Sequence, residues 1–246
     1  MLAFSSLLGN VEGQNIYRIW YDKPASYWEE ALPVGNGRIA AMVFGNPQLE
    51  QIQLNEETVS AGSPYQNYNE EAKTALPEMR RLIFEGKYEE AQNMAATKIL
   101  SQVGNEMPYQ TVGRLNIRYP DHKKVNNYYR DLDISNAVAV TRYEVDGVEF
   151  TEETFASFTD QLVIRHIKAS KPGTINCELF FNTPMRDPKR SIYGKKGLRL
   201  EGITHGSRYF SGKVHYCADL DVKHKGGKVI TANDTLPVSY THLRAH

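Results

Sequence analysis

Alternation of hydrophobic and polar residues dominates the chain from Ile16 onward, and short turn sequences interrupt it. Residues 37–44 carry apolar side chains at both odd and even positions, which predicts a strand covered on both faces. Residues 51–54 alternate glutamine with isoleucine and leucine, which predicts a half-buried strand. Gly45-Asn46-Pro47 lies between the two segments and predicts the turn that joins them.

The second half of the chain repeats this pattern. Asp146-Gly147 lies between the alternating segments 141–145 and 148–155, and it is the strongest hairpin signal in the sequence. Segments 162–169 and 174–181 are predicted to pair through Lys171-Pro172-Gly173. Many short strands with regularly spaced turns predict a mainly β protein, a large antiparallel β-sandwich of the supersandwich type. Two last strands are predicted at 213–222 and 229–231.

One segment, residues 69–100, has a different period. Apolar residues recur at helical spacing from Leu76 to Ile83, and Pro77 suits the first turn of a helix. Gly86 suits a helix end, and a second apolar series begins after it. The sequence therefore predicts a short two-helix insertion near residues 69–100 within the β domain.

Composition narrows the classes of partner. Lys plus Arg equals Asp plus Glu at 29 each, so no net charge attracts the chain to nucleic acid, and a neutral ligand fits better. No stretch approaches the roughly 18 apolar residues of a membrane span. The 15 tyrosines suit sugar rings as well as ordinary sheet surfaces.

The two ends of the chain differ from its middle. Residues 1–14 contain a short apolar run and then small residues, which resembles a clipped export signal and favours an exported, periplasmic or extracellular protein. Residues 237–246 do not continue the pattern of strands and turns, and we interpret them as a non-native tail. The domain itself is then expected to span residues 15–236.

The glycine-rich segment Gly35–Ala40 satisfies the dinucleotide pattern GxGxxA, and Glu56 follows at the distance of a ribose-binding acid. Its context argues against a cofactor. Pro33 interrupts a strand leading into the glycines, and the following residues predict a strand instead of the helix that pyrophosphate binding requires. We interpret Asn36-Gly37 as a hairpin turn with positive φ, and we expect no cofactor.

Other candidate chemistry is sparse. Neighbouring carboxylates in a strand point to opposite faces, whereas an inverting glycosidase needs two separated carboxyls with water between them. A solvated surface is therefore the favoured interpretation of four acidic pairs: Glu29-Glu30, Glu56-Glu57, Glu89-Glu90 and Glu152-Glu153. His215 and Cys217 share a strand face, but their spacing matches no known metal pattern, so no metal site is expected. Cys177 and Cys217 predict no disulfide framework.

Seven motifs follow one another along the chain: Trp28-Glu29-Glu30-Ala31-Leu32-Pro33-Val34-Gly35-Asn36-Gly37-Arg38, Ala41-Met42-Val43-Phe44-Gly45, Gln51-Ile52-Gln53-Leu54-Asn55-Glu56, Leu76-Pro77-Glu78-Met79-Arg80-Arg81-Leu82, Glu85-Gly86-Lys87-Tyr88, Tyr109-Gln110-Thr111-Val112-Gly113-Arg114-Leu115 and Tyr129-Arg130-Asp131-Leu132-Asp133. In their order and spacing they resemble glycoside hydrolase family 95, the inverting bacterial α-L-fucosidases. The resemblance covers residues 15–235.

This resemblance implies an N-terminal β-sandwich followed by a helical linker, a catalytic toroid of paired helices and a C-terminal β domain. The general acid and the water-activating residues of that family lie in the toroid, so no catalytic residue is expected here. The implied partners are this catalytic (α/α) domain and, through the parent enzyme, a fucosylated glycan. At residues 59–62 the chain has Val-Ser-Ala-Gly where the family usually has Leu-Trp-Ser-Gly, which implies a different substrate preference or interface.

Four residues are our candidates for an interdomain or cleft-facing surface: Asn36, Arg38, Asn55 and Glu56. Loops on a rigid scaffold often carry such roles, although turn and surface duties explain the same residues equally well. Two further hypotheses remain open. The chain is either an autonomous carbohydrate-binding sandwich that uses its tyrosines for stacking, or a purely structural domain.

Overall fold

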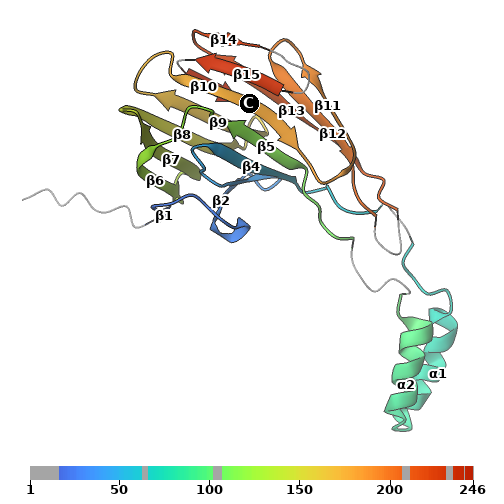
Figure 1. The fold of residues 1–246 in the computed structure, drawn as a ribbon. Coiled ribbons are helices and arrows are strands. Elements are labelled where there is room, and N and C mark those ends of the chain that lie inside the picture. Colours follow the sequence, from blue (N-terminus) through green and yellow to red (C-terminus); the bar gives the residue numbers. More distant parts are fainter. Residues whose placement is uncertain are drawn as a thin grey trace, which may run out of the picture.

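The protein is a β-sandwich of two antiparallel sheets with a helical hairpin that extends away from them (Figure 1). The computed structural model describes residues 17–62, 66–101, 107–206, 211–230, 235–240 and 242–245, with the backbone alone from residue 238 onward. The expected fold class, a mainly β antiparallel sandwich with two inserted helices, is confirmed.

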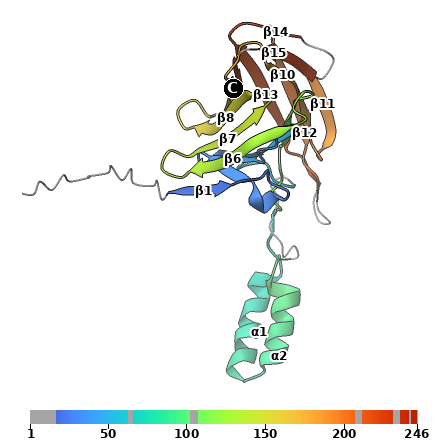
Figure 2. The ribbon, with the colours of Figure 1, turned by 60° about the vertical axis from the view of Figure 1, so that its left-hand side comes forward.

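The larger sheet has nine strands, and its neighbouring pairs are antiparallel. Strand β1 forms one edge (Figure 2) and β11 forms the other. In spatial order its strands are β1 (Arg18–Tyr21), β6 (Val125–Asp133), β7 (Val138–Val145), β8 (Val148–Ser157), β9 (Leu162–Ala169), β16 (His242–Ala245), β13 (His215–His224), β12 (Gly197–Ile203) and β11 (Arg186–Tyr193).

The smaller sheet has seven strands and faces the larger one. A short 3₁₀ turn, η1 (Trp28–Glu30), leads into its edge strand β2. In spatial order its strands are β14 (Lys228–Val229), β15 (Thr235–Tyr240), β10 (Ile175–Asn182), β5 (Gly113–Arg118), β4 (Leu49–Glu56), β3 (Ile39–Val43) and β2 (Leu32–Gly35).

The hydrophobic core lies between the two sheets, because alternate residues of each strand point inward. Ile52 and Ile117 of the smaller sheet and Phe150, Ile167 and Leu200 of the larger sheet belong to one buried cluster. The alternating sequence pattern therefore identifies which side chains of a strand enter the core.

Two turns are formed as the sequence predicts. Asp146 and Gly147 both have positive φ, 49° and 71°, and they join β7 directly to β8. This conformation suits the right-handed twist of the flanking strands. Gly37 has φ 91° in the turn between β2 and β3, where the backbone N–H of Asn36 donates to the carbonyl of Ile39 at 3.1 Å. The hairpin interpretation of Asn36-Gly37 is confirmed.

The insertion consists of α1 (Ala72–Phe84), α2 (Tyr88–Met94) and a closing π turn, η2 (Ala95–Ile99). The two helices lie side by side (Figure 2). Gly86 separates them with φ 76°, as expected. The placement of Pro77 was wrong: it lies inside α1, because the helix begins at Ala72, one turn earlier than its apolar pattern. Polar residues at a helix start leave no hydrophobic signal.

Three strand predictions are corrected. β9 and β10 do not pair, because the Lys171-Pro172-Gly173 turn carries the chain from the larger sheet to the smaller one. The strand at 37–44 is covered fully on one face and partly on the other, since Ala41 and Val43 are buried while Ala40 is exposed and Met42 is half-buried. Pro33 does not interrupt a strand, because β2 is an edge strand and tolerates a missing N–H.

The sequence predicts an export signal at one end of the chain and a non-native tail at the other. Residues 1–14 lie outside the described residues, so the export signal stays a prediction. Residues 237–246, interpreted as a non-native tail, include the end of β15 and all of β16, which pairs with β9 and β13. Their origin is not tested by that pairing. Among the described helices, none has the length and apolarity needed to cross a membrane.

Candidate functional site

The four candidate residues lie at one end of the sandwich, where the chain leaves β4 for the helical insertion and returns at β5. We call this the insertion end and define it by the turns at 36–38, 57–62, 107–112 and 157–161. The β2–β3 turn carries Asn36 and Arg38, and the last two residues of β4 are Asn55 and Glu56. The structure therefore places all four on the same end of the fold.

Asn36 connects the two sheets at this end. Its Oδ1 accepts hydrogen bonds from the backbone N–H groups of Arg38 and Ile39 at 3.1 and 3.0 Å, so the side chain holds its own turn. Its Nδ2 donates to the carbonyl oxygen of Ser157 at 2.8 Å, where β8 ends in the larger sheet. Asn36 is thus a structural residue of the turn as well as a member of the surface.

Arg38 and Glu56 form an ion pair on the rim, with Arg38 Nε 3.3 Å from Glu56 Oε1. Thr58 donates to Glu56 Oε2 from its backbone N–H at 2.8 Å and from its hydroxyl at 2.6 Å. Partial burial alone would raise the pKa of Glu56, but the hydrogen bonds from Thr58 and Arg38 outweigh it, and the pKa is lowered. Glu56 is therefore ionised at neutral pH and poorly suited to act as a general acid.

A cavity of about 310 Å³ opens between the sheets at the insertion end. Its lining is mostly apolar and includes Leu54, Leu115 and Leu220, and its polar members are Asn55, Glu56, Gln161, Arg165 and Asp219. Asn55 Oδ1 is buried and has no hydrogen-bond partner among the described residues. A mainly apolar hollow with a few polar groups has the form of a small-ligand pocket, and the same form accepts an apolar side chain of a neighbouring domain.

Exposed aromatic rings surround this end. Phe158, in the turn between β8 and β9, is 76% exposed, and Tyr109, where the insertion returns to the sheet, is 54% exposed. Phe84 and Tyr88, which are 89% and 69% exposed, lie where α1 turns into α2 in the hairpin that extends away from the sandwich. Large exposed apolar rings at the insertion end and on an extended hairpin are typical of surfaces that another domain covers.

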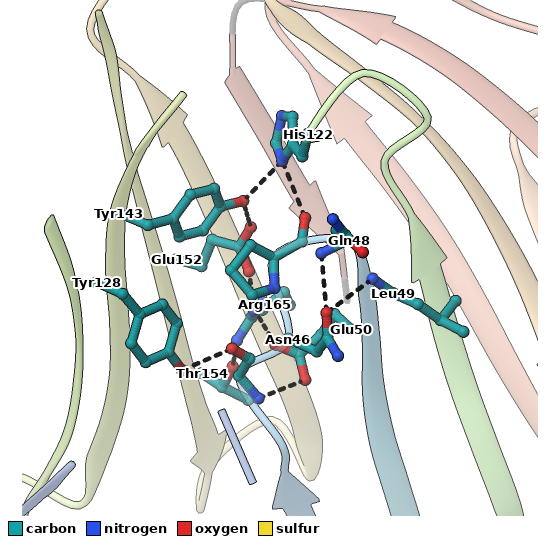
Figure 3. A network of polar contacts seen from close by, with 12 residues as sticks. Asn46, Gln48, Leu49, Glu50, His122, Tyr128, Tyr143, Glu152, Thr154 and Arg165 are labelled. Atoms are coloured by element: carbon teal, nitrogen blue, oxygen red, sulfur yellow. Dashed lines mark hydrogen bonds and ion pairs between the residues drawn. The ribbon is translucent and has the colours of Figure 1, made fainter. Parts of the chain in front are cut away.

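A network of charged and polar side chains lies buried between the sheets (Figure 3). The sequence analysis did not predict it. Arg165 of β9 donates to Glu50 Oε2 of β4 at 2.9 Å, to Thr154 Oγ1 at 2.5 Å, and to Glu152 of β8. Tyr143 donates its hydroxyl to Glu152 Oε1 at 2.7 Å. We call Glu50, Glu152 and Arg165 the charged triad.

The charged triad corrects one expectation. The Glu152-Glu153 pair was expected on a solvated surface, but Glu152 is only 1% exposed, because it lies in phase with the core residue Phe150 on β8. Burial raises the pKa of Glu50 to about 7, against the attraction of Arg165. Two carboxylates share one guanidinium, all three side chains are at most 1% exposed, and the triad joins the two sheets at the inner wall of the cavity, which Arg165 lines.

The remaining candidates are the two cysteines and His215. Cys177 is buried and Cys217 is exposed, and both are free thiols. Within the part of the chain that the structure describes, no three His, Cys, Asp or Glu side chains gather to hold a metal ion. His215 and Cys217 lie in phase on β13, as expected from their spacing.

The geometry of the turn predicts different effects for its two polar residues. Asn36→Ala removes three hydrogen bonds and should lower the free energy of unfolding by about 1–2 kcal/mol. Arg38→Ala removes one exposed ion pair and should change it by less than about 0.5 kcal/mol. Urea unfolding followed by circular dichroism compares them. Equal losses in the two variants would contradict the assigned roles.

The chain is similar in sequence to several known proteins. A family model described as "Glycosyl hydrolase family 65, N-terminal domain" matches residues 19–245. The chain is 37% identical over 181 residues to "Alpha-L-fucosidase 2" of Arabidopsis thaliana, which covers 71% of this chain and 21% of that protein. It is 26% identical over 162 residues to "Probable alpha-fucosidase A" of Aspergillus niger, covering 62% of this chain and 20% of the relative. The chain spans about a fifth of the length of these relatives.

Proposed function

Because this chain belongs to the family of glycosyl hydrolase family 65 N-terminal domains, we propose that its parent protein is an exported enzyme that removes α-L-fucosyl residues from glycans. The expectation of a glycoside hydrolase N-terminal domain related to fucosidases is confirmed at that level. The observation that carries the proposal further is the 37% identity to a protein named as an α-L-fucosidase.

The proposed mechanism is that of family 95, hydrolysis with inversion, often at α-1,2 linkages. In such a reaction one carboxylic acid protonates the leaving oxygen while a base activates water on the opposite face. In this chain Glu56 is ionised and held by Thr58, and the side chains of the charged triad are at most 1% exposed. We therefore assign the acid and base to the remainder of the parent protein.

The role proposed for this domain is to support and position the catalytic domain through the insertion end. Exposed rings at Phe158 and Tyr109 and the apolar cavity between the sheets support this role. Arg38 is 58% exposed and is held in place by Glu56, so it can contact a neighbouring domain without rearrangement. Asn36 and Asn55 then shape the surface, Asn36 by holding the turn.

The parent activity is tested with the full-length enzyme. We expect release of L-fucose from 2′-fucosyllactose, measured with fucose dehydrogenase, and NMR of the first product should show the inverted anomer. This chain alone should release none, because we assign the acid and the base to the remainder of the parent protein. Failure on every fucosylated and L-galactosylated substrate would falsify the proposal.

The supporting role is tested separately, by Arg38→Ala and Phe158→Ala in the full-length enzyme. We expect lower activity with unchanged thermal unfolding of this chain, because both side chains are exposed and contribute little to its own stability. Tyr27→Ala is the matched control, since Tyr27 is 65% exposed but lies beside η1, outside the insertion end. An equal loss of activity in the control would contradict a role specific to that end.

A further inference from the structure

The outer face of the nine-stranded sheet carries an aromatic pair at its β1 edge, far in sequence from the insertion. Trp20 of β1 and Tyr129 of β6 lie with ring centroids 6.2 Å apart and planes inclined by only 20°. Trp20 is 61% exposed, which is unusual for so large an apolar ring on a regular strand. The two near-parallel rings support each other, and the indole of Trp20 is open to solvent.

Charged groups are built around these rings with fixed geometry. Asp131 lies opposite Trp20 in the β1–β6 register, and its side chain is only 1% exposed. Its Oδ2 lies 3.1 Å from Arg18 Nη1 and 3.7 Å from Arg142 Nη1, so one buried carboxylate holds two guanidinium groups beside the aromatic pair. Its Oδ1 has no hydrogen-bond partner among the described residues. We call Arg18, Trp20, Tyr129, Asp131 and Arg142 the β1–β6 platform.

We propose that the β1–β6 platform binds a neutral glycan, whose pyranose ring stacks on Trp20 and whose hydroxyl groups meet the two arginines. An indole face suits the apolar face of a sugar ring, and rigid guanidinium forks donate to neighbouring hydroxyl oxygens. Holding both arginines in advance reduces the entropy that binding would cost.

Charge balance favours a neutral ligand over an anionic one. Arg18 and Arg142 are offset by Asp131 and by Asp133, whose Oδ2 lies 3.6 Å from Arg18 Nη2. No excess of positive charge remains to attract a carboxylate or phosphate, although a neutral polyol still finds donors and acceptors. This binding does not depend on the proposed hydrolysis, because it uses neither the insertion end nor the charged triad.

The test is isothermal titration of this chain with cellohexaose, a neutral glycan of flat, equatorially substituted rings, and with hexagalacturonate as its anionic counterpart. We expect saturable binding of cellohexaose and no saturable binding of hexagalacturonate. Trp20→Ala should weaken cellohexaose binding about tenfold or more, and Trp20→Tyr by less than about threefold, because a smaller ring still stacks. Arg142→Ala should weaken it by about threefold to tenfold.

Trp28→Ala is the matched control, because Trp28 is the second of the two tryptophans and is also exposed, but lies in η1. Its affinity should stay within about twofold of wild type. Unchanged affinity in Trp20→Ala, or no binding of cellohexaose at all, overturns the proposal. A dimer that Trp20→Ala converts to a monomer in light scattering also overturns it, because the platform would then be a contact between two copies. The test of fucose release by the parent enzyme is independent of this titration, so the two proposals can fail separately.

Discussion

Arg165→Met is expected to lower the free energy of unfolding by about 3–5 kcal/mol, the largest single effect we anticipate in this domain. Arg165 and the two carboxylates it binds are at most 1% exposed, and its guanidinium is the cation that both contact. Without it, Glu50 and Glu152 remain buried beside each other and lose the cation that contacts both of them. Equilibrium unfolding in urea, with circular dichroism and fluorescence compared for coincidence, measures the loss.

Arg199→Met is the matched control for this substitution. Arg199 also forms a two-pronged pair, with Asp219 at 2.6 and 2.7 Å, but both side chains are about one third exposed. Its loss should cost less than about 1 kcal/mol. Glu50→Gln in the Arg165→Met background should recover part of the stability, because it removes one uncompensated charge. Similar losses from Arg165→Met and Arg199→Met would contradict the assigned importance of burial.

Stability should also depend on pH through Glu50. Its pKa is raised to about 7 in the folded chain, above the ordinary glutamate value, so the folded state binds the proton more tightly than the unfolded state. The stability that this group contributes is therefore complete at low pH and is lost as pH rises through 7. Between pH 5.5 and pH 8 the loss should reach about 2 kcal/mol.

Other titratable groups also make the stability depend on pH, so the contribution of Glu50 must be separated from theirs. Burial lowers the pKa of His122, so its contribution has the opposite sign and is lost as pH falls below its unfolded value. The useful quantity is therefore the free energy of unfolding of wild type minus that of Glu50→Gln at each pH, which should rise as pH falls from 8 to 5.5. A constant difference from pH 8 to pH 5.5 would sink the idea. The groups that face Glu50 are Arg165, Glu152, Tyr143, Tyr128 and Arg130.

Much of the local structure could be predicted from the sequence, because it depends on neighbours in the chain. Asp146-Gly147 needs only its own positive φ angles to form a hairpin, and Gly86 needs only its own to end a helix. Partnership between strands could not be predicted in the same way. Periodicity shows that β9 and β10 are strands, but the turn between them does not reveal that it crosses from one sheet to the other.

The interdomain or cleft-facing role of the four candidate residues stays a prediction. Asn36, Arg38, Asn55 and Glu56 do lie together at the insertion end, but their partners Ser157 and Thr58 were not foreseen. The charged triad left one usable signal, since Glu50 lies two residues before Ile52 and so in phase with the buried face of β4. A single exposed aromatic residue such as Trp20 leaves no usable signal in the sequence.

The sequence by itself determined the β-sandwich class, the helical insertion and the turns, since period, glycine and asparagine act within a few residues. Only the tertiary structure decided that Arg165 meets Glu50 across 115 positions of sequence, and that Trp20 meets Tyr129. A sequence pattern shows which face of a strand is buried. It does not show what lies opposite, because that depends on how the two sheets close over each other.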